Sequence, residues 1–229
     1  MWAYTEFMTV LGARSVPHRL PTAIRTARRA LPLVGCGLPA SALGNPAVAG
    51  WVRGHGLVVT VADGGDLDLV RASGVCPTHV VLRCGDAGTI RRAAASGVQR
   101  FVVSEDRHVD VLAGCPASSK HIYVDDRGPA VIGERRLDIV GMHCDVADSD
   151  GSAEWGAAAE RLLSRLALMR RCGMAPARIS LGGGPVGMWL AGGGRQLVAI
   201  ASAVDDALEE GCARWRLPRP AVTLMPLGR

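Results

Sequence analysis

The composition of this 229-residue chain is that of an ordinary globular protein, with 48% hydrophobic and 21% charged residues. Aromatic residues make up 4% of the chain, which leaves little material for the stacking platforms that bind single-stranded nucleic acids. The formal net charge is +5, but the arginines occur as pairs spread along the chain rather than in one basic segment. Such pairs are typical of solvated helix faces, so we expect no nucleic-acid partner.

The cysteines and the chain's apolar runs indicate the cellular compartment. Seven cysteines form no C-x-x-C pair and are odd in number, so the sequence predicts neither a disulfide framework nor a zinc ribbon. The first fifteen residues do not resemble a signal peptide, and no apolar run approaches the roughly 18 residues that cross a bilayer. We therefore expect a cytoplasmic protein without membrane contact.

Short apolar runs alternate with helical stretches from one end of the chain to the other. Eight runs are predicted to be parallel strands buried on both faces, because they are apolar throughout rather than alternating with polar residues. They are Leu33–Cys36, Leu57–Val61, His79–Arg83, Arg100–Ser104, His121–Asp125, Leu137–His143, Arg178–Leu181 and Ala221–Met225.

Helices are predicted between most of these strands. They are Asn45–Gly54, Asp66–Ser73, Thr89–Ser96, Asp106–Ala113, Ser152–Arg171 and Arg195–Arg214. A helix at Pro21–Leu31 precedes the first strand and none follows the eighth, so we expect this helix to fill the empty position in the outer layer. Residues 126–136, which contain Gly128-Pro129, are too short and broken for a full helix.

This pattern predicts a compact (β/α)8 TIM-like barrel, in a single domain spanning residues 1–229, with a shortened connection between strands five and six. An open, doubly wound sheet is the alternative architecture. In a barrel the active site lies at the C-terminal ends of the strands, so the residues after each strand are the first candidates for function.

A run of three glycines, Gly182, Gly183 and Gly184, follows the seventh predicted strand. Backbone N–H groups can approach a phosphate closely there, because no side chain obstructs it. A tight turn explains the run equally well. Gly192–Gly194, ahead of the next helix, is interpreted as a loop.

Several segments carry motifs in a recognisable order. Residues 62–67 read ADGGDL, residues 96–104 read SGVQRFVVS, Val140–Cys144 reads VGMHC, Leu181–Gly184 reads LGGG and Met225–Arg229 reads MPLGR. In this order they resemble the SGGEL, AGVxxxVVDS, GLHCHIGS, LGGGFG and EPGR motifs of the fold-type III pyridoxal-phosphate (PLP) decarboxylases, the diaminopimelate and ornithine decarboxylase family. The resemblance extends over nearly the whole chain.

The resemblance implies a barrel that binds PLP, with Gly182, Gly183 and Gly184 at the positions that hold the cofactor phosphate in the family. His143 matches the first histidine of the HCH segment, and Gly228 and Arg229 match the end of EPGR. These six residues are the cofactor-binding candidates.

The departures from the family fall on its catalytic residues. The family holds PLP as a Schiff base on a lysine of the first strand, where this chain has Cys36 or Gly37. The chain's one lysine, Lys120, precedes the fifth strand and is therefore expected at the wrong end of the barrel. Asp145 replaces the family's second histidine, and Met225 replaces the glutamate that pairs with the pyridine nitrogen. The family's SKFG loop and C-terminal β-domain are also expected to be absent.

The roles of Cys36 and His143 are left open by the sequence. Cys36 is either a nucleophile or, as its lack of a nearby base favours, a buried structural cysteine. His143 either contacts a ligand or is a satisfied histidine of the core. Asp145, Asp148 and Asp150 have a spacing that is common in solvated loops, and no metal site is predicted.

Three functions are compatible with these residues. The favoured one is a non-catalytic regulatory homologue that binds a small phosphorylated ligand. If that ligand is PLP, it is bound without a covalent bond. The chain would form a homodimer, or a heterodimer with an intact homologue. The second is an amino-acid decarboxylase-like enzyme with altered chemistry that uses His143, Asp145 and Cys36. The third is a decayed gene product.

Overall fold

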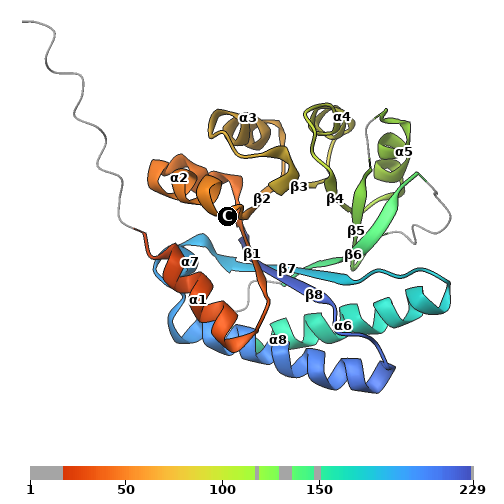
Figure 1. Ribbon diagram of the computed structural model, residues 1–229. Helices are drawn as coiled ribbons and strands as arrows, with labels where there is room; N and C mark the ends of the chain where they lie inside the picture. Colours follow the sequence, from red (N-terminus) through yellow and green to blue (C-terminus); the bar gives the residue numbers. More distant parts are fainter. Residues whose placement is uncertain (1–17, 117–118, 129–135, 147–150, 228–229) are drawn as a thin grey trace, which may run out of the picture.

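The computed structural model describes residues 18–116, 119–128, 136–146 and 151–227, and its strands form a barrel. The strands in these ranges are β1 (Gly35–Pro39), β2 (Val58–Val61), β3 (Val80–Arg83), β4 (Arg100–Val103), β5 (His121–Asp125), β6 (Asp138–Asp145), β7 (Arg178–Pro185) and β8 (Ala221–Leu227). All pairings are parallel and follow chain order, and β8 also pairs with β1 (Figure 1). The predicted (β/α)8 barrel is confirmed, and the alternative of an open sheet is wrong.

Helices surround the barrel (Figure 1). They are α1 (Leu20–Ala30), α2 (Pro46–His55), α3 (Gly64–Ala72), α4 (Ala87–Ala95), α5 (Asp106–Gly114), α6 (Ser152–Arg171), α7 (Val186–Leu190) and α8 (Gly194–Trp215), with two 3-10 helices, η1 (Ala40–Gly44) and η2 (Pro77–His79). Side chains of Asn45, Asp63 and Asp86 accept hydrogen bonds from the first-turn N–H groups of α2, α3 and α4, which explains where these helices begin.

The helix α1 takes a position in the outer layer of the barrel, as predicted. It buries Leu20, Ala23, Ile24 and Ala27 on one face and packs beside α8 and α7 (Figure 1). The strand that follows begins two residues later than predicted. The reason is Leu33, which is 97% exposed and has a left-handed φ of 64°, so the chain turns there before it enters the sheet.

Two connections differ from regular βα units. The short helix α7 was not predicted, because five residues are too few to display a helical period. The loop predicted at Gly192–Gly194 is confirmed for Gly192 and Gly193, whereas Gly194 begins α8; all three glycines have positive φ. Residues 126–137 separate β5 from β6, and 129–135 lie outside the described residues, so the shortened connection is described at its ends alone.

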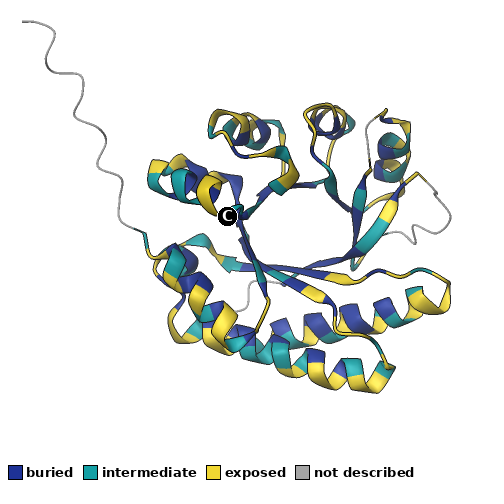
Figure 2. Ribbon diagram, viewed as in Figure 1, coloured by how far each residue is buried: buried dark blue, intermediate teal, exposed yellow. Residues whose placement is uncertain are grey.

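The hydrophobic core lies mainly between the strands and the helices, where Figure 2 shows the helix faces turned toward the barrel as buried. Trp155, Trp189 and Phe101 are the largest fully buried side chains in the described ranges. A smaller cluster of Val81, Val102 and Tyr123 is separate from this layer. Among the described helices, none is long and apolar enough to cross a membrane.

Candidate functional site

A cavity of about 330 Å³ opens where the strands end, which we call the barrel mouth. Its walls come from the ends of β1, β2, β3, β6 and β8 and from the β2–α3 loop. The lining residues are Pro39, Ser41, Thr60, Val61, Ala62, Asp63, Asp66, Arg83, Asp145, Met225, Pro226 and Leu227. This is the position at which TIM barrels carry their active sites.

An ion pair between Arg83 and Asp145 crosses the mouth. Arg83 ends β3 and Asp145 ends β6, so the pair joins strands that are separated by β4 and β5. The guanidinium donates two hydrogen bonds to the carboxylate: one from Nη1 to Oδ1 at 2.7 Å, and a second from Nη2 to Oδ2. Such fork-shaped pairing fixes both side chains in orientation as well as in position.

His143 extends this pair into the interior of the barrel. Its side chain is 1% exposed, its Nε2 lies 3.0 Å from Oδ1 of Asp145, and its Nδ1 lies 3.0 Å from Oγ of Ser180 on β7. A neutral ring satisfies both contacts, with Nε2–H donating to Asp145 and Nδ1 accepting from the Ser180 hydroxyl. The result is a continuous chain of side chains from Arg83 to Ser180.

The charge of Asp145 is stabilised by this arrangement. Burial opposes its ionisation, but the hydrogen bonds from His143 and Arg83, together with the positive charge of Arg83, hold the pKa of Asp145 well below its ordinary value. A permanent carboxylate therefore faces the cavity at neutral pH.

Serine, histidine and aspartate are the residue types of hydrolytic triads, but their order in space is reversed here. Asp145 lines the mouth, whereas Ser180 is 5% exposed at the buried end of the chain and does not line the cavity. A triad requires its serine at the substrate. The arrangement thus holds Asp145 and Arg83 in place rather than activating Ser180.

The three glycines lie within β7, which continues to Pro185 instead of ending at Leu181 as predicted. A Cβ atom on Gly182 would lie 2.9 Å from Oδ1 of Asp145, and one on Gly183 would lie 2.6 Å from Cζ2 of Trp155 on α6. Gly184 has a φ of 68°. Packing or backbone conformation thus explains why each position is a glycine, which supports a structural role for the run rather than phosphate binding. Their role in phosphate binding stays a prediction.

Cys36 and Gly37 lie on opposite sides of β1. A Cβ atom on Gly37 would lie 3.3 Å from Cβ of Met225, which lines the mouth, so position 37 faces the barrel interior. Cys36 is buried beside α1; burial raises the pKa of its thiol to about 12, against a smaller opposing effect of Arg28. The structure does not bring Cys36 to His143 and Asp145, and its environment fits the structural interpretation.

Lys120 lies at the N-terminal end of β5, opposite the mouth, as predicted. It is 5% exposed, and its Nζ donates a 2.8 Å hydrogen bond to the carbonyl oxygen of Cys115. Gly228 and Arg229, and also Asp148 and Asp150, lie outside the described residues. In the described ranges, no group of three His, Cys, Asp or Glu residues is placed to hold a metal ion.

Sequence reasoning missed Arg83, Asp63 and Asp66 as residues of the mouth. The signal for Arg83 was a charged residue at the C-terminal end of an apolar strand. Asp63 and Asp66 shape the β2–α3 loop: Asp63 accepts a hydrogen bond from the N–H of Asp66, whose carboxylate accepts one from the N–H of Ala62.

The described residues do not fit PLP held as a Schiff base. No lysine lies at the mouth, because Lys120 is at the other end of the barrel. Met225 offers no acid to a pyridine nitrogen. Three carboxylates and one guanidinium line the cavity, so its net negative charge opposes a phosphate dianion.

A scan against protein-family models and a search of curated proteins find no match. Solved structures do match. SrLDC in complex with PLP and cadaverine is 20% identical, with a TM-score of 0.72 over 91% of this chain and 58% of that chain. Diaminopimelate decarboxylase from M. jannaschi is 13% identical, with a TM-score of 0.72 over 90% and 58%.

A third match is the lysine/ornithine decarboxylase from Vibrio vulnificus complexed with putrescine, at 19% identity and a TM-score of 0.72 over 90% of this chain and 60% of that chain. The chain therefore spans between 58% and 60% of the length of these three proteins. At such identities the comparisons establish the fold. The expected resemblance to the decarboxylase barrel is confirmed at that level.

Proposed function

We propose that this chain is a non-catalytic, decarboxylase-like barrel that binds a small molecule non-covalently at its mouth and acts as a regulatory homologue. The observation that carries the proposal is the position of Lys120. The lysine is buried at the end of the barrel opposite the cavity, with its ammonium group bound to the Cys115 carbonyl oxygen. No lysine is therefore available for Schiff-base chemistry at the mouth.

The cavity itself supports ligand binding. It is concave, has polar groups on several walls, and contains an ion pair that is already oriented before any ligand arrives. Such preorganised groups reduce the cost of binding. PLP, which SrLDC binds, is the first ligand to test. Its phosphate would require Gly182–Gly184 and a cation such as Arg229.

The test is an equilibrium titration of the chain with PLP followed by absorbance, then borohydride reduction and intact-mass measurement. We expect no reduced adduct, in the native chain and in the matched control Lys120→Arg alike, and saturable binding would identify PLP as the ligand. A stoichiometric adduct on Lys120 would overturn the proposal. Absence of saturable binding would exclude PLP as the ligand.

A second candidate function is an enzyme with altered chemistry, favoured by the hydrogen-bonded chain from Arg83 to Ser180. Asp145 is the one acidic member of that chain and it faces the cavity. Alanine substitutions of His143 and Asp145, tested for turnover of amino acids, discriminate the two functions. Turnover by the native chain that both substitutions abolish would support the enzyme, whereas no turnover by the native chain supports the binding protein.

A further inference from the structure

The solvent-exposed face of α8 carries a stripe of residues that no described element covers. Its buried face consists of Leu197, Ile200, Ala201, Val204, Leu208 and Gly211. The opposite face, at spacings of three and four residues, presents Arg195, Val198, Ala199, Ser202, Asp206 and Glu209. Val198 is 43% exposed, a large fraction for an apolar side chain. Figure 2 shows this outer side of α8 as exposed or intermediate.

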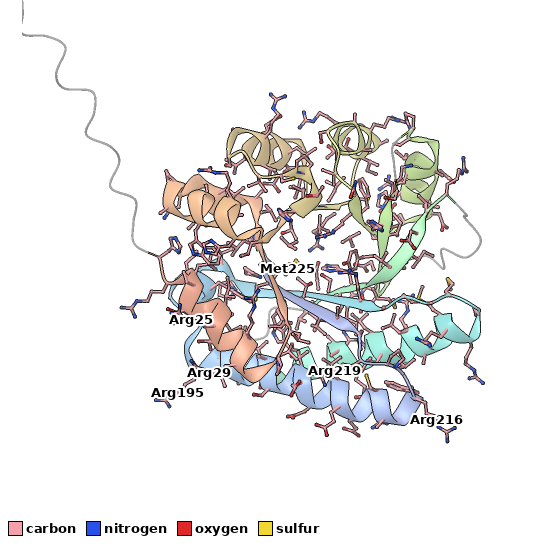
Figure 3. All side chains as sticks on the ribbon, in the orientation of Figure 1. Arg25, Arg29, Arg195, Arg216, Arg219 and Met225 are labelled. Carbon is pink, nitrogen blue, oxygen red and sulfur yellow. The ribbon has the colours of Figure 1, made fainter. Side chains whose placement is uncertain are left out.

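The stripe has a basic end and an acidic end. At the N-terminal end, Arg195 lines a groove of about 710 Å³ between α1 and α8 together with Arg19 and Arg29, and no carboxylate lines this groove. In Figure 3, Arg25, Arg29 and Arg195 lie at the same end of the α1–α8 pair. None of these arginines forms an ion pair with a described carboxylate.

The acidic end begins about three turns further along the helix. Asp205 and Glu210 are engaged by Arg219 and Arg214 of the same chain. Asp206 and Glu209 are exposed and form no ion pair or hydrogen bond within the described residues. They are the carboxylates of this face that are available to a partner.

We propose that α8 is the interface of a homodimer in which the two α8 helices pack antiparallel about a twofold axis at Ser202. Arg195 and Glu209 each lie seven residues from Ser202, about 10 Å along the helix on either side. The twofold rotation therefore brings Arg195 of one chain opposite Glu209 of the partner subunit, and the reverse. Asp206 of the partner subunit comes beside Val198 and the groove that Arg29 lines.

The residues at the centre of the stripe permit this contact. Ala199 and Ser202 are small, so two helices can approach to the 8–10 Å interaxial distance of packed helices. Val198 becomes covered instead of remaining in water, which is favourable.

A second copy of this chain fits this surface better than a different partner with an acidic segment does. An acidic segment lying along the whole stripe would meet Asp206 and Glu209 and be repelled by them. The order of charges, basic then acidic, matches itself when the direction of the helix is reversed. This proposal does not depend on the ligand-binding function of the mouth.

The test is a charge swap read by analytical ultracentrifugation. We expect the native chain to sediment at twice the 23.9 kDa mass of one chain as its concentration rises. Arg195→Glu and Glu209→Arg should each weaken the dimer by at least about tenfold, because each replaces two attractive pairs by two repulsive ones. The control Arg91→Glu, an exposed arginine on α4, should leave the dimer unchanged.

The two variants mixed together, and the double variant R195E/E209R, should both recover the dimer, since each combination restores opposite charges across the axis. Far-UV circular dichroism checks that every variant is folded. A native chain that stays monomeric at its highest soluble concentration would overturn the proposal. So would a dimer insensitive to the single reversals, or a mixture that does not recover the dimer.

Discussion

At the scale of single residues, the alternation of side chains along each strand decides which residues reach the mouth. His143 and Asp145 are two positions apart on β6, so both face the barrel interior, and they contact each other. Cys144, between them, lies on the other side of the strand near Arg161 of α6, and burial raises the pKa of its thiol to about 12. The same alternation separates Cys36 from Gly37.

The first prediction concerns the charge of Asp145. Asp145→Asn keeps the side-chain size but removes the charge, and we expect it to lower the free energy of unfolding by about 1–3 kcal/mol at neutral pH. The pKa of Asp145 lies below its ordinary value of 3.8 in the folded chain. The stabilisation is therefore present above pH 3.8 and is lost as the pH falls through the lower folded-state pKa.

Urea unfolding followed by tryptophan fluorescence, at neutral pH and below pH 3.8, measures this effect. The difference between the native chain and Asp145→Asn should narrow in acid. Asp68→Asn, which alters an exposed carboxylate 3.4 Å from Arg92, is the control and should change stability little. A difference that stays constant with pH would contradict the assignment.

The second prediction concerns the two sides of β1. Gly37→Lys, combined with Met225→Ala to make room, should place an amine in the mouth, whereas Cys36→Lys with Met225→Ala should bury one beside Arg28. After incubation with pyridoxal, an aldehyde without the phosphate, and borohydride reduction, intact mass should show an adduct at position 37 and none at position 36. The Cys36 variant should also be the less stable of the two, because its ammonium is buried. Equal adduct formation by the two lysine variants would refute the assignment of position 37, rather than position 36, to the interior side of β1.

At the scale of elements, close approaches between strands and helices account for glycines that otherwise resemble a binding motif. Gly183 of β7 contacts Trp155 of α6 where a side chain would collide with the indole ring. On the same helix, Gly156 lies against the backbone of Ala203 on α8. These contacts bring α6 and α8 into the layer that supports β7 and β8 (Figure 1).

The third prediction tests this packing. Gly183→Ala should lower the free energy of unfolding by about 1–3 kcal/mol, because its Cβ would lie 2.6 Å from Cζ2 of Trp155. Gly187→Ala, on α7, is the matched control: no atom lies within 4 Å of its added Cβ, and alanine favours the helix. Thermal unfolding of both variants gives the comparison. Equal stability of the two would show that the Trp155 contact does not constrain position 183.

At the scale of the whole molecule, closure of the barrel makes the two ends of the described chain interdependent. β8 pairs with β7 on one side and with β1 on the other. Leu224 of β8 lies opposite Cys36 and Leu181 in these two pairings and is 0% exposed. Loss of contacts at this strand should therefore lower the stability of the whole barrel.

The fourth prediction follows from closure. Leu224→Ala should destabilise the protein by about 2–5 kcal/mol, as large-to-small substitutions in a packed core do. Because unfolding is cooperative, far-UV circular dichroism and the fluorescence of the buried Trp155 and Trp189 should shift together. Two separate transitions would mean that β8 can detach while the rest of the barrel persists.

The amino-acid sequence by itself determined the eight strands, most of the helices and the barrel. Buried parallel strands are apolar on both faces, so Val58–Val61 or Arg100–Val103 can be recognised without knowledge of their neighbours. The absence of a lysine from the first strand was equally visible, because residue identity requires no coordinates. Short elements such as α7 could not be predicted, since five residues do not show a helical period.

The tertiary structure decided how the mouth is built. Arg83 and Asp145 are 62 positions apart, and nothing in either segment indicates that they meet. Their contact depends on strand register and on the curvature of the closed sheet, both of which arise from the packing of all eight strands. The same holds for α8, where the sequence shows a basic residue followed by acidic ones, but burial of one face identifies the stripe that faces solvent.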